Sequence, residues 1–132
     1  MPDELRYARG WFLKAESDLV TAERMTESDG PYDTACFHAQ QAAEKYLKGL
    51  LALHGQAFHP THNLEELQQV GEGSVPRWPL TGMDLTELTS YAVQVRYDFD
   101  FWPDHGTALQ ALETVREVRR RVLAVVPEQA RP

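Results

Sequence analysis

The chain has 132 residues with a net charge of −7 and a single cysteine, Cys36. This length corresponds to one domain, residues 1–132, with a core that needs no metal or disulfide. One cysteine excludes an internal disulfide or a Cys-based zinc site, and the charge excludes long-range attraction of nucleic acid. No signal peptide or apolar span of about 18 residues is visible, so we expect a cytoplasmic protein without membrane contact.

Hydrophobic periodicity predicts helices at about 3–28, 33–54, 63–70, 84–95 and 104–126. Asn63 with Glu66, and Asp84 with Glu87, match capping boxes that open the third and fourth of these. The stretch GEGSVPRWPLTG between them reads as irregular because it is rich in Gly and Pro. Strand signals are nearly absent, so the sequence predicts an all-α antiparallel helical bundle.

Three ionisable residues interrupt the apolar stripes of these helices: Asp18, Arg96 and Arg119. A buried lone charge is costly unless it is paired, so we expect an ion pair from Asp18 to Arg119 or Arg96. The alternatives are that the arginines extend to the rim, or that one stays free in a cleft to bind a phosphate. Glu44 is a second possible partner for an inward arginine, and the basic run Arg116–Arg121 reads as a solvated helix face.

The run YDTACFHAQQAAEKYLKGLLALHG (residues 32–55), with KAESDLVTAERM before it, PTHNLEEL after it and RYDFDFWPD further on, resembles the HEPN family of small prokaryotic helical domains. The resemblance implies an up-and-down bundle of about five helices that forms a homodimer. It also implies a possible minimal nucleotidyltransferase partner in a toxin–antitoxin pair, and RNA or nucleotide as ligand. Many such proteins are metal-independent RNases whose site is an Arg followed, after four to six residues, by a His.

Arg96 and His105 are the candidate catalytic pair, but eight residues separate them. His105 would accept the proton of a ribose 2′-hydroxyl, and Arg96 would stabilise charge on the phosphorane. Tyr97 and Trp102 would stack on bases, whereas Asp98, Asp100 and Asp104 would repel phosphate. The alternatives are a binding module whose site has decayed, or a dimeric interaction module without enzymatic role.

Two histidine sets remain. His38 and Lys45 fall on the outer face of the second helix, where they would bind a nucleotide phosphate, a partner or only water. His54, His59 and His62 cluster around one loop, but their loose spacing favours a local hydrogen-bonding role over zinc. We therefore expect neither a metal nor a cofactor.

Overall fold

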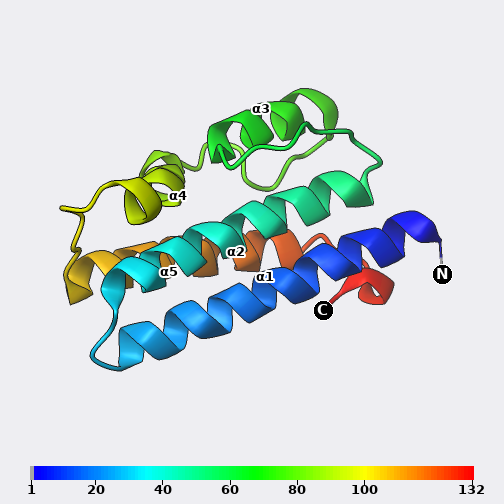
Figure 1. The fold of residues 1–132 in the computed structure, drawn as a ribbon. Helices are drawn as coiled ribbons and strands as arrows, with labels where there is room; N and C mark the ends of the chain where they lie inside the picture. The colour runs from blue at the N-terminus through cyan, green and yellow to red at the C-terminus, as the bar shows by residue number, and fades with distance from the viewer. Residues whose placement is uncertain (1) are drawn as a thin grey trace.

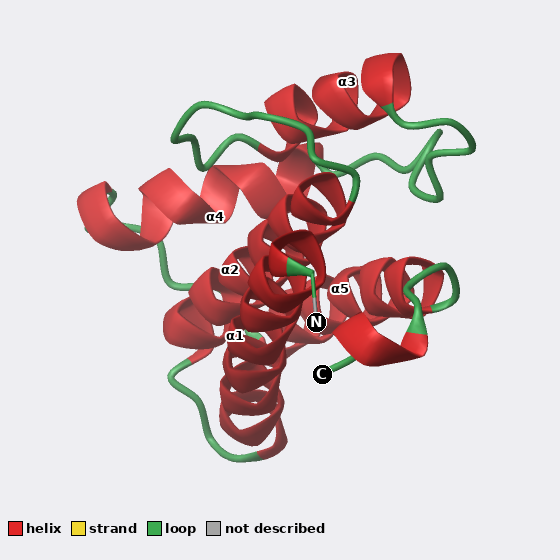
Figure 2. Cartoon of the chain, turned by 90° about the vertical axis from the view of Figure 1, so that its right-hand side faces the viewer, coloured by secondary structure: helices red, strands yellow, loops and turns green. Residues whose placement is uncertain are grey.

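The computed structural model describes residues 2–132, which form five α-helices and no strand (Figure 1). The bounds are α1 Asp3–Glu27, α2 Tyr32–Leu53, α3 Leu64–Ser74, α4 Thr86–Tyr97 and α5 His105–Leu123, followed by a short 3-10 turn, Glu128–Ala130. The predicted all-α bundle is confirmed. Helices α1, α2 and α5 run alongside one another, while α3 and α4 cover the opposite flank of α2 (Figures 1 and 2).

Helix α2 is the centre of the bundle, because it packs against each of the four other helices. Its buried residues spread around most of its circumference, whereas those of α1 form a single stripe. Close approach of the two helices depends on Gly49, since a Cβ there would lie 2.4 Å from Cε1 of the Phe12 ring. The missing side chain lets a large aromatic ring pack directly on the α2 backbone.

Helix α3 is longer than predicted and continues through the segment GEGS to Ser74. Gly71 acts here as a packing residue and not as a helix breaker, because the Trp78 indole occupies the space of its absent Cβ. The Trp78 Nε1–H donates to the Gln68 amide oxygen, and the Gln68 amide donates to the Leu80 carbonyl at 2.8 Å. This contact holds the irregular segment after α3 against the helix.

The two predicted helix starts differ, because α3 has a side-chain cap at Asn63 whereas the N-cap residue of α4, Leu85, makes none. Asn63 Oδ1 accepts the N–H groups of Glu65 and Glu66 at 2.9 and 3.3 Å, as an N-cap should. Asp84 Oδ1 accepts from Thr86, whereas its predicted partner Glu87 accepts from the Tyr91 hydroxyl at 2.9 Å. Neither capping box is therefore formed as predicted, because the Asn63 N–H donates to Thr61 Oγ1 at 3.0 Å and not to Glu66.

The expected pairing of Asp18 with an arginine is wrong. Asp18 binds His38 Nδ1 at 2.8 Å and the Lys45 ammonium, both on α2. Arg119 pairs instead with Glu16 at 2.9 Å, across the α1–α5 contact. The partner depends on the register of antiparallel helices, which brings the His38–Lys45 face of α2 against the middle of α1.

Candidate functional site

The corner between α4 and α5 carries both candidate catalytic residues. Helix α4 ends at Tyr97, a tight turn closes with the Phe101 N–H donating to the Asp98 carbonyl at 3.1 Å, and α5 begins at His105. The Phe101 ring packs on Tyr91, with 5.6 Å between ring centroids. Phe101 is thus the aromatic side chain that fixes this loop to the bundle.

Arg96 is exposed and does not point inward as predicted. Its Nε–H donates to the Ala92 carbonyl at 2.8 Å, and its guanidinium lies 5.2 Å from the centre of the Tyr97 ring. Within residues 2–132, no carboxylate lies within ion-pair distance of this guanidinium. The fork of Nη donors is therefore available to an anion.

His105 is held by the opposite side of the corner. Its Nε2 lies 3.0 Å from the carbonyl oxygen of Thr26, in the last turn of α1, and its ring meets Tyr32 edge-on at 5.4 Å. A carbonyl can only accept, so Nε2 carries the hydrogen. In the neutral ring the lone pair then lies on Nδ1, which makes Nδ1 the atom able to take a proton.

Arg96 and His105 are thus anchored on different elements. Arg96 is tied to its own helix and to Tyr97, whereas His105 is tied to the end of α1. None of the hydrogen bonds or ring contacts of the described residues joins the two side chains. Both side chains are exposed, at the two ends of the 98–104 segment.

Three carboxylates share the corner and are exposed to solvent: Asp98, Asp100 and Asp104. Asp104 caps α5, where the N–H and hydroxyl of Thr107 donate to its Oδ1 at 2.8 and 2.9 Å. These hydrogen bonds lower the pKa of the Asp104 carboxyl and keep it ionised. The corner therefore presents negative charge beside the Arg96 guanidinium.

Three large aromatic side chains at the corner are mostly exposed: Tyr97 at 69%, Phe99 at 87% and Trp102 at 75%. Val93, on the preceding turn of α4, is also exposed. Such a concentration of apolar side chains within a few residues is typical of an interaction surface. Tyr97 and Trp102 are where base stacking was predicted, but the same exposure fits a protein interface.

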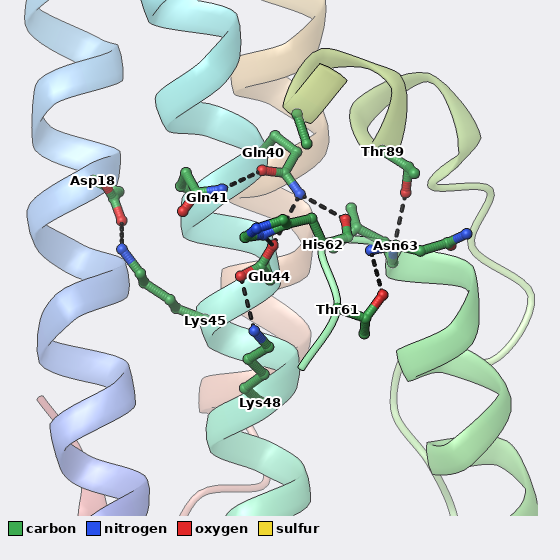
Figure 3. Close-up of polar contacts among 12 residues, drawn as sticks. Asp18, Gln40, Gln41, Glu44, Lys45, Lys48, Thr61, His62, Asn63 and Thr89 are labelled. Carbon is green, nitrogen blue, oxygen red and sulfur yellow. Dashed lines mark hydrogen bonds and ion pairs between the residues drawn. The ribbon is translucent and has the colours of Figure 1, made fainter. Parts of the chain in front are cut away.

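A second polar cluster lies along α2, between α1 and the loop before α3 (Figure 3). His38 and Lys45 are here, on a face that packs against α1 and is only partly exposed. Because Asp18 binds both side chains, their positive charge is already compensated within the chain. An external phosphate would have to compete with Asp18 for them.

The deeper half of this cluster centres on Glu44, whose side chain is 4% exposed. Its oxygens lie 2.9 Å from Lys48 Nζ and 2.9 Å from His62 Nδ1, and 3.3 Å from the Gln40 amide nitrogen. The Gln40 amide also donates to the His62 carbonyl at 3.0 Å. These contacts fasten the 59–63 loop to α2, and they show that Glu44 is no partner for an arginine.

Sequence reasoning considered Glu44 only as a partner for an inward arginine and missed the row that it forms with Gln40 and Lys48. The available signal was their spacing, because residues 40, 44 and 48 recur every four positions inside a segment that is otherwise largely apolar. Polar side chains at i and i+4 face one another on a helix. A buried hydrogen-bonded row was therefore readable from the sequence.

Comparison with known proteins decides the family. The family model described as HEPN domain matches residues 8–125. The chain belongs to the HEPN family. Its structure is similar to the crystal structure of TT1696 from Thermus thermophilus, with 29% sequence identity, a TM-score of 0.72, and coverage of 89% of this chain and 96% of that one. No curated protein gives a significant match.

Within this HEPN domain the histidines of the loop before α3 have separate partners and form no common site. His59 lies 2.9 Å from Glu66, whereas His62 is bound to Glu44. No group of three or more His, Cys, Asp or Glu side chains with metal-binding geometry occurs among residues 2–132. Over the same residues, no helix has the length and apolar character needed to span a membrane.

The basic run of α5 in the HEPN domain is an ion-paired surface. Arg116 reaches Glu23 of α1 at 2.6 Å, while Arg120 and Arg121 both bind Glu117 on their own helix. With Arg119 bound to Glu16, every arginine of the run has a glutamate partner. The run therefore differs from the free basic patch that RNA binding requires.

Proposed function

We propose that this HEPN protein is a homodimeric binding protein, paired with a minimal nucleotidyltransferase in a toxin–antitoxin-type system. Residues 1–132 act in it as one domain. The observation that carries the proposal is the exposed aromatic set of the α4–α5 corner: Tyr97, Phe99 and Trp102. Exposed side chains of this size lose unfavourable contact with water when a second molecule covers them.

The contacts of the corner favour binding over catalysis. Arg96 and His105 are fixed by different helices, and eight residues separate them instead of the four to six of nuclease members of the family. Ionised Asp104 and its two neighbouring aspartates oppose the approach of phosphate. A nucleotide or RNA ligand would therefore depend on the Arg96 fork and on stacking at Tyr97 and Trp102.

The dimer is tested by the mass of the purified chain in light scattering. We expect twice the 15.0 kDa monomer mass, reverting to the monomer mass in the Phe99→Ser/Trp102→Ser variant. Val125→Ser is the matched control, because Val125 is also exposed but follows the last turn of α5, whereas the corner precedes its first turn. A dimer that survives the corner changes refutes this interface.

The partner is tested by co-expression with the neighbouring gene. We expect that gene to encode a minimal nucleotidyltransferase that co-purifies with the chain. If the neighbouring gene encodes no such protein, or if the two products do not associate, the paired role is wrong. A dimer without partner or nucleotide would then leave the chain as a dimeric interaction module.

One observation favours a second candidate, a metal-independent RNase. The Thr26 carbonyl holds His105 in the tautomer whose Nδ1 can act as a base, and the Arg96 Nη donors are free. In that reaction His105 would take the 2′-hydroxyl proton, and the 2′-oxygen would attack phosphorus to form a 2′,3′-cyclic phosphate. The 5′-oxygen would leave and take a proton from water. Arg96 would stabilise the pentavalent phosphorane.

An RNA-cleavage assay in EDTA separates the two functions. The RNase is supported if cleavage occurs and is lost in Arg96→Ala/His105→Ala. Absence of cleavage, or cleavage unchanged by the double substitution, excludes the RNase and leaves the binding role. His38→Ala is a useful comparison, because that ring is bound to Asp18 on a different face.

A further inference from the structure

A groove at the opposite end of the bundle from the α4–α5 corner has no role in the proposed function. Its lining residues belong to the first turns of α1, the end of α2 and the loop after it. These segments lie at the end of the molecule that carries the N-terminus (Figures 1 and 2). Its volume is about 720 Å³, within the range of ligand sites. The residues that form it are Asp3, Glu4, Arg6, Tyr7, Gly10, and Phe58 with its neighbours in the loop after α2.

Two aromatic side chains line the groove, Tyr7 and Phe58, and Trp11 lies between them beside the adjoining hollow. Tyr7, 59% exposed, meets Trp11 edge-on at 6.0 Å, and Trp11 meets Phe58 edge-on at 6.3 Å. On the inner side, the Lys48 ammonium lies 5.5 Å from the Trp11 ring and 5.9 Å from the Phe58 ring. Trp11 and Phe58 thus already contact a cation of the chain itself, and of these two rings Phe58 lines the groove.

Gly10 keeps the groove open. A Cβ at this position would find nothing within 4 Å, so packing within the chain does not require glycine here. In a helix interior glycine is about 0.5–1 kcal/mol less favourable than alanine. Tyr7 and Gly10 also border a second hollow with Trp11 and Lys14, so the depression continues past Gly10 along α1.

The charges of the groove are opposite at its two ends. Arg6 binds Asp3, but Glu4 has no cationic partner among residues 2–132, and its Oε1 lies 3.4 Å from where a Gly55 Cβ would be. Helix α2 ends here without a basic residue in its last turn, so its carbonyl end adds partial negative charge. At the far end, Lys14 also has no acidic partner in the described chain.

The length of the groove favours a peptide over a small molecule as its ligand. From Asp3 to Lys14 the α1 axis rises roughly 16 Å at about 1.5 Å per residue. An extended peptide of about five residues spans the same distance at about 3.3 Å per residue. One amine or guanidinium compound would fill only the end near Glu4.

We propose that this groove binds an extended segment of a partner protein, with an arginine or lysine at the Glu4 end, apolar side chains against Tyr7 and Phe58, and an acidic group near Lys14. The Glu4 carboxylate pairs with the basic side chain, and the aromatic walls cover its aliphatic stem. Gly10 gives the peptide backbone room to approach α1. This proposal is independent of dimerisation and RNA chemistry at the corner.

The test uses the ¹⁵N-labelled full chain and defined pentapeptides, acetylated and amidated, of sequence Arg-Leu-Gly-Leu-Glu and its reverse. The two orders sample both chain directions. We expect saturable shifts of the Tyr7, Gly10, Gln56 and Phe58 amides with one of them. Replacing Arg by Gln in that peptide should weaken binding about two- to fivefold, the range for an exposed ion pair. Shifts confined to the corner, or no saturation with either peptide, overturn the proposal.

Substitutions in the chain locate the charge contact. Glu4→Gln should weaken the arginine peptide to the affinity of its glutamine analogue and leave the analogue unchanged. Glu113→Gln removes the same charge from the exposed surface of α5 and should alter neither affinity. Equal effects of the two substitutions would mean that only net charge matters, which contradicts a Glu4 contact.

Gly10 separates a binding role from a folding role. Gly10→Leu should abolish peptide binding by filling the groove. Gly10→Ala should raise Tm through helix propensity while weakening the peptide, a combination that a merely structural glycine would not give. If Gly10→Leu binds normally, the groove is not the site.

Parallel measurements test two other occupants of the groove, a small molecule and a second copy of the chain. N-acetylarginine amide should not saturate the chain at concentrations that saturate the peptide, and equal affinity would mean a small-molecule site. The same amides should not move with protein concentration alone, since such movement would mean that a second copy fills the groove. Either result refutes a peptide partner.

Discussion

Replacing Glu44 by Met should cost about 3–5 kcal/mol of folding free energy, the range for breaking a buried ion pair by removal of one partner. The Lys48 side chain is 9% exposed, and its ammonium pairs with Glu44 at 2.9 Å. Without Glu44 the ammonium keeps only the faces of Trp11 and Phe58, at 5.5 and 5.9 Å. These contacts replace a small part of the lost interaction.

Removal of Glu44 affects its two other hydrogen-bonding partners, His62 and Gln40, less than it affects Lys48. The His62 side chain is 55% exposed and can turn to water, and the Gln40 amide keeps its bond to the His62 carbonyl at 3.0 Å. The double variant Glu44→Met/Lys48→Met removes both charges and retains apolar volume. Its stability should therefore lie within about 1 kcal/mol of the parent chain.

Urea unfolding followed by helical circular dichroism measures all four members of this double-mutant cycle. We expect the Glu44→Met variant to be less stable than the double variant, and a coupling energy of at least about 2 kcal/mol between the two positions. A Glu44→Met cost below about 1 kcal/mol, the value for exposed pairs, would refute the reasoning. It would mean that water reaches Lys48 and that the 59–63 loop leaves α2 easily.

Three further changes test other contacts. Gly71→Ala should lower the free energy of unfolding in urea by about 1–3 kcal/mol, although alanine favours helix more than glycine does. The cause is overpacking, because the new Cβ would lie 2.3 Å from Cε2 of the buried Trp78. An unchanged urea midpoint would contradict this packing. Cys36 should resist thiol reagents in the native chain at pH 8 and react only after unfolding, since burial raises its pKa to about 12; rapid native labelling would contradict it. Asp104→Ala should lower Tm through loss of the Thr107 cap, whereas Asp100→Ala should change it little; equal Tm values for the two variants would contradict the cap.

The helices were predictable because their stabilising faces repeat with the helical period. The buried positions Ala15, Leu19 and Ala22 of α1 follow that period, as predicted. Helix α3 was predicted too short because Gly71 and Gly73 disfavour helix in isolation. The stabilisation from packing Trp78 on Gly71 is a tertiary contact, which the local sequence pattern does not show.

The charged residues were harder to place for two different reasons. Arg96 follows the inward stripe of α4 on a helical wheel, but α4 ends at Tyr97 and the chain turns away, so no element covers that position. Asp18 does lie at a helix contact, as its wheel position predicts. Its partners could not be predicted, because the sequence does not show whether Lys45 or Arg119 faces Asp18 until the register between the helices is known.

Dimerisation and RNA binding at the corner make opposite demands on salt. Two corners brought together would juxtapose the Asp98, Asp100 and Asp104 carboxylates of each copy, and the exposed aromatic side chains must offset that repulsion. Added salt screens the repulsion, so the dimer should tighten as ionic strength rises. A phosphate contact at Arg96 releases counterions and should weaken instead. Sedimentation and RNA titration from about 50 to roughly 500 mM salt therefore distinguish dimerisation from RNA binding at the corner. An RNA affinity that rises with salt would show that base stacking, and not Arg96, supplies the RNA contact.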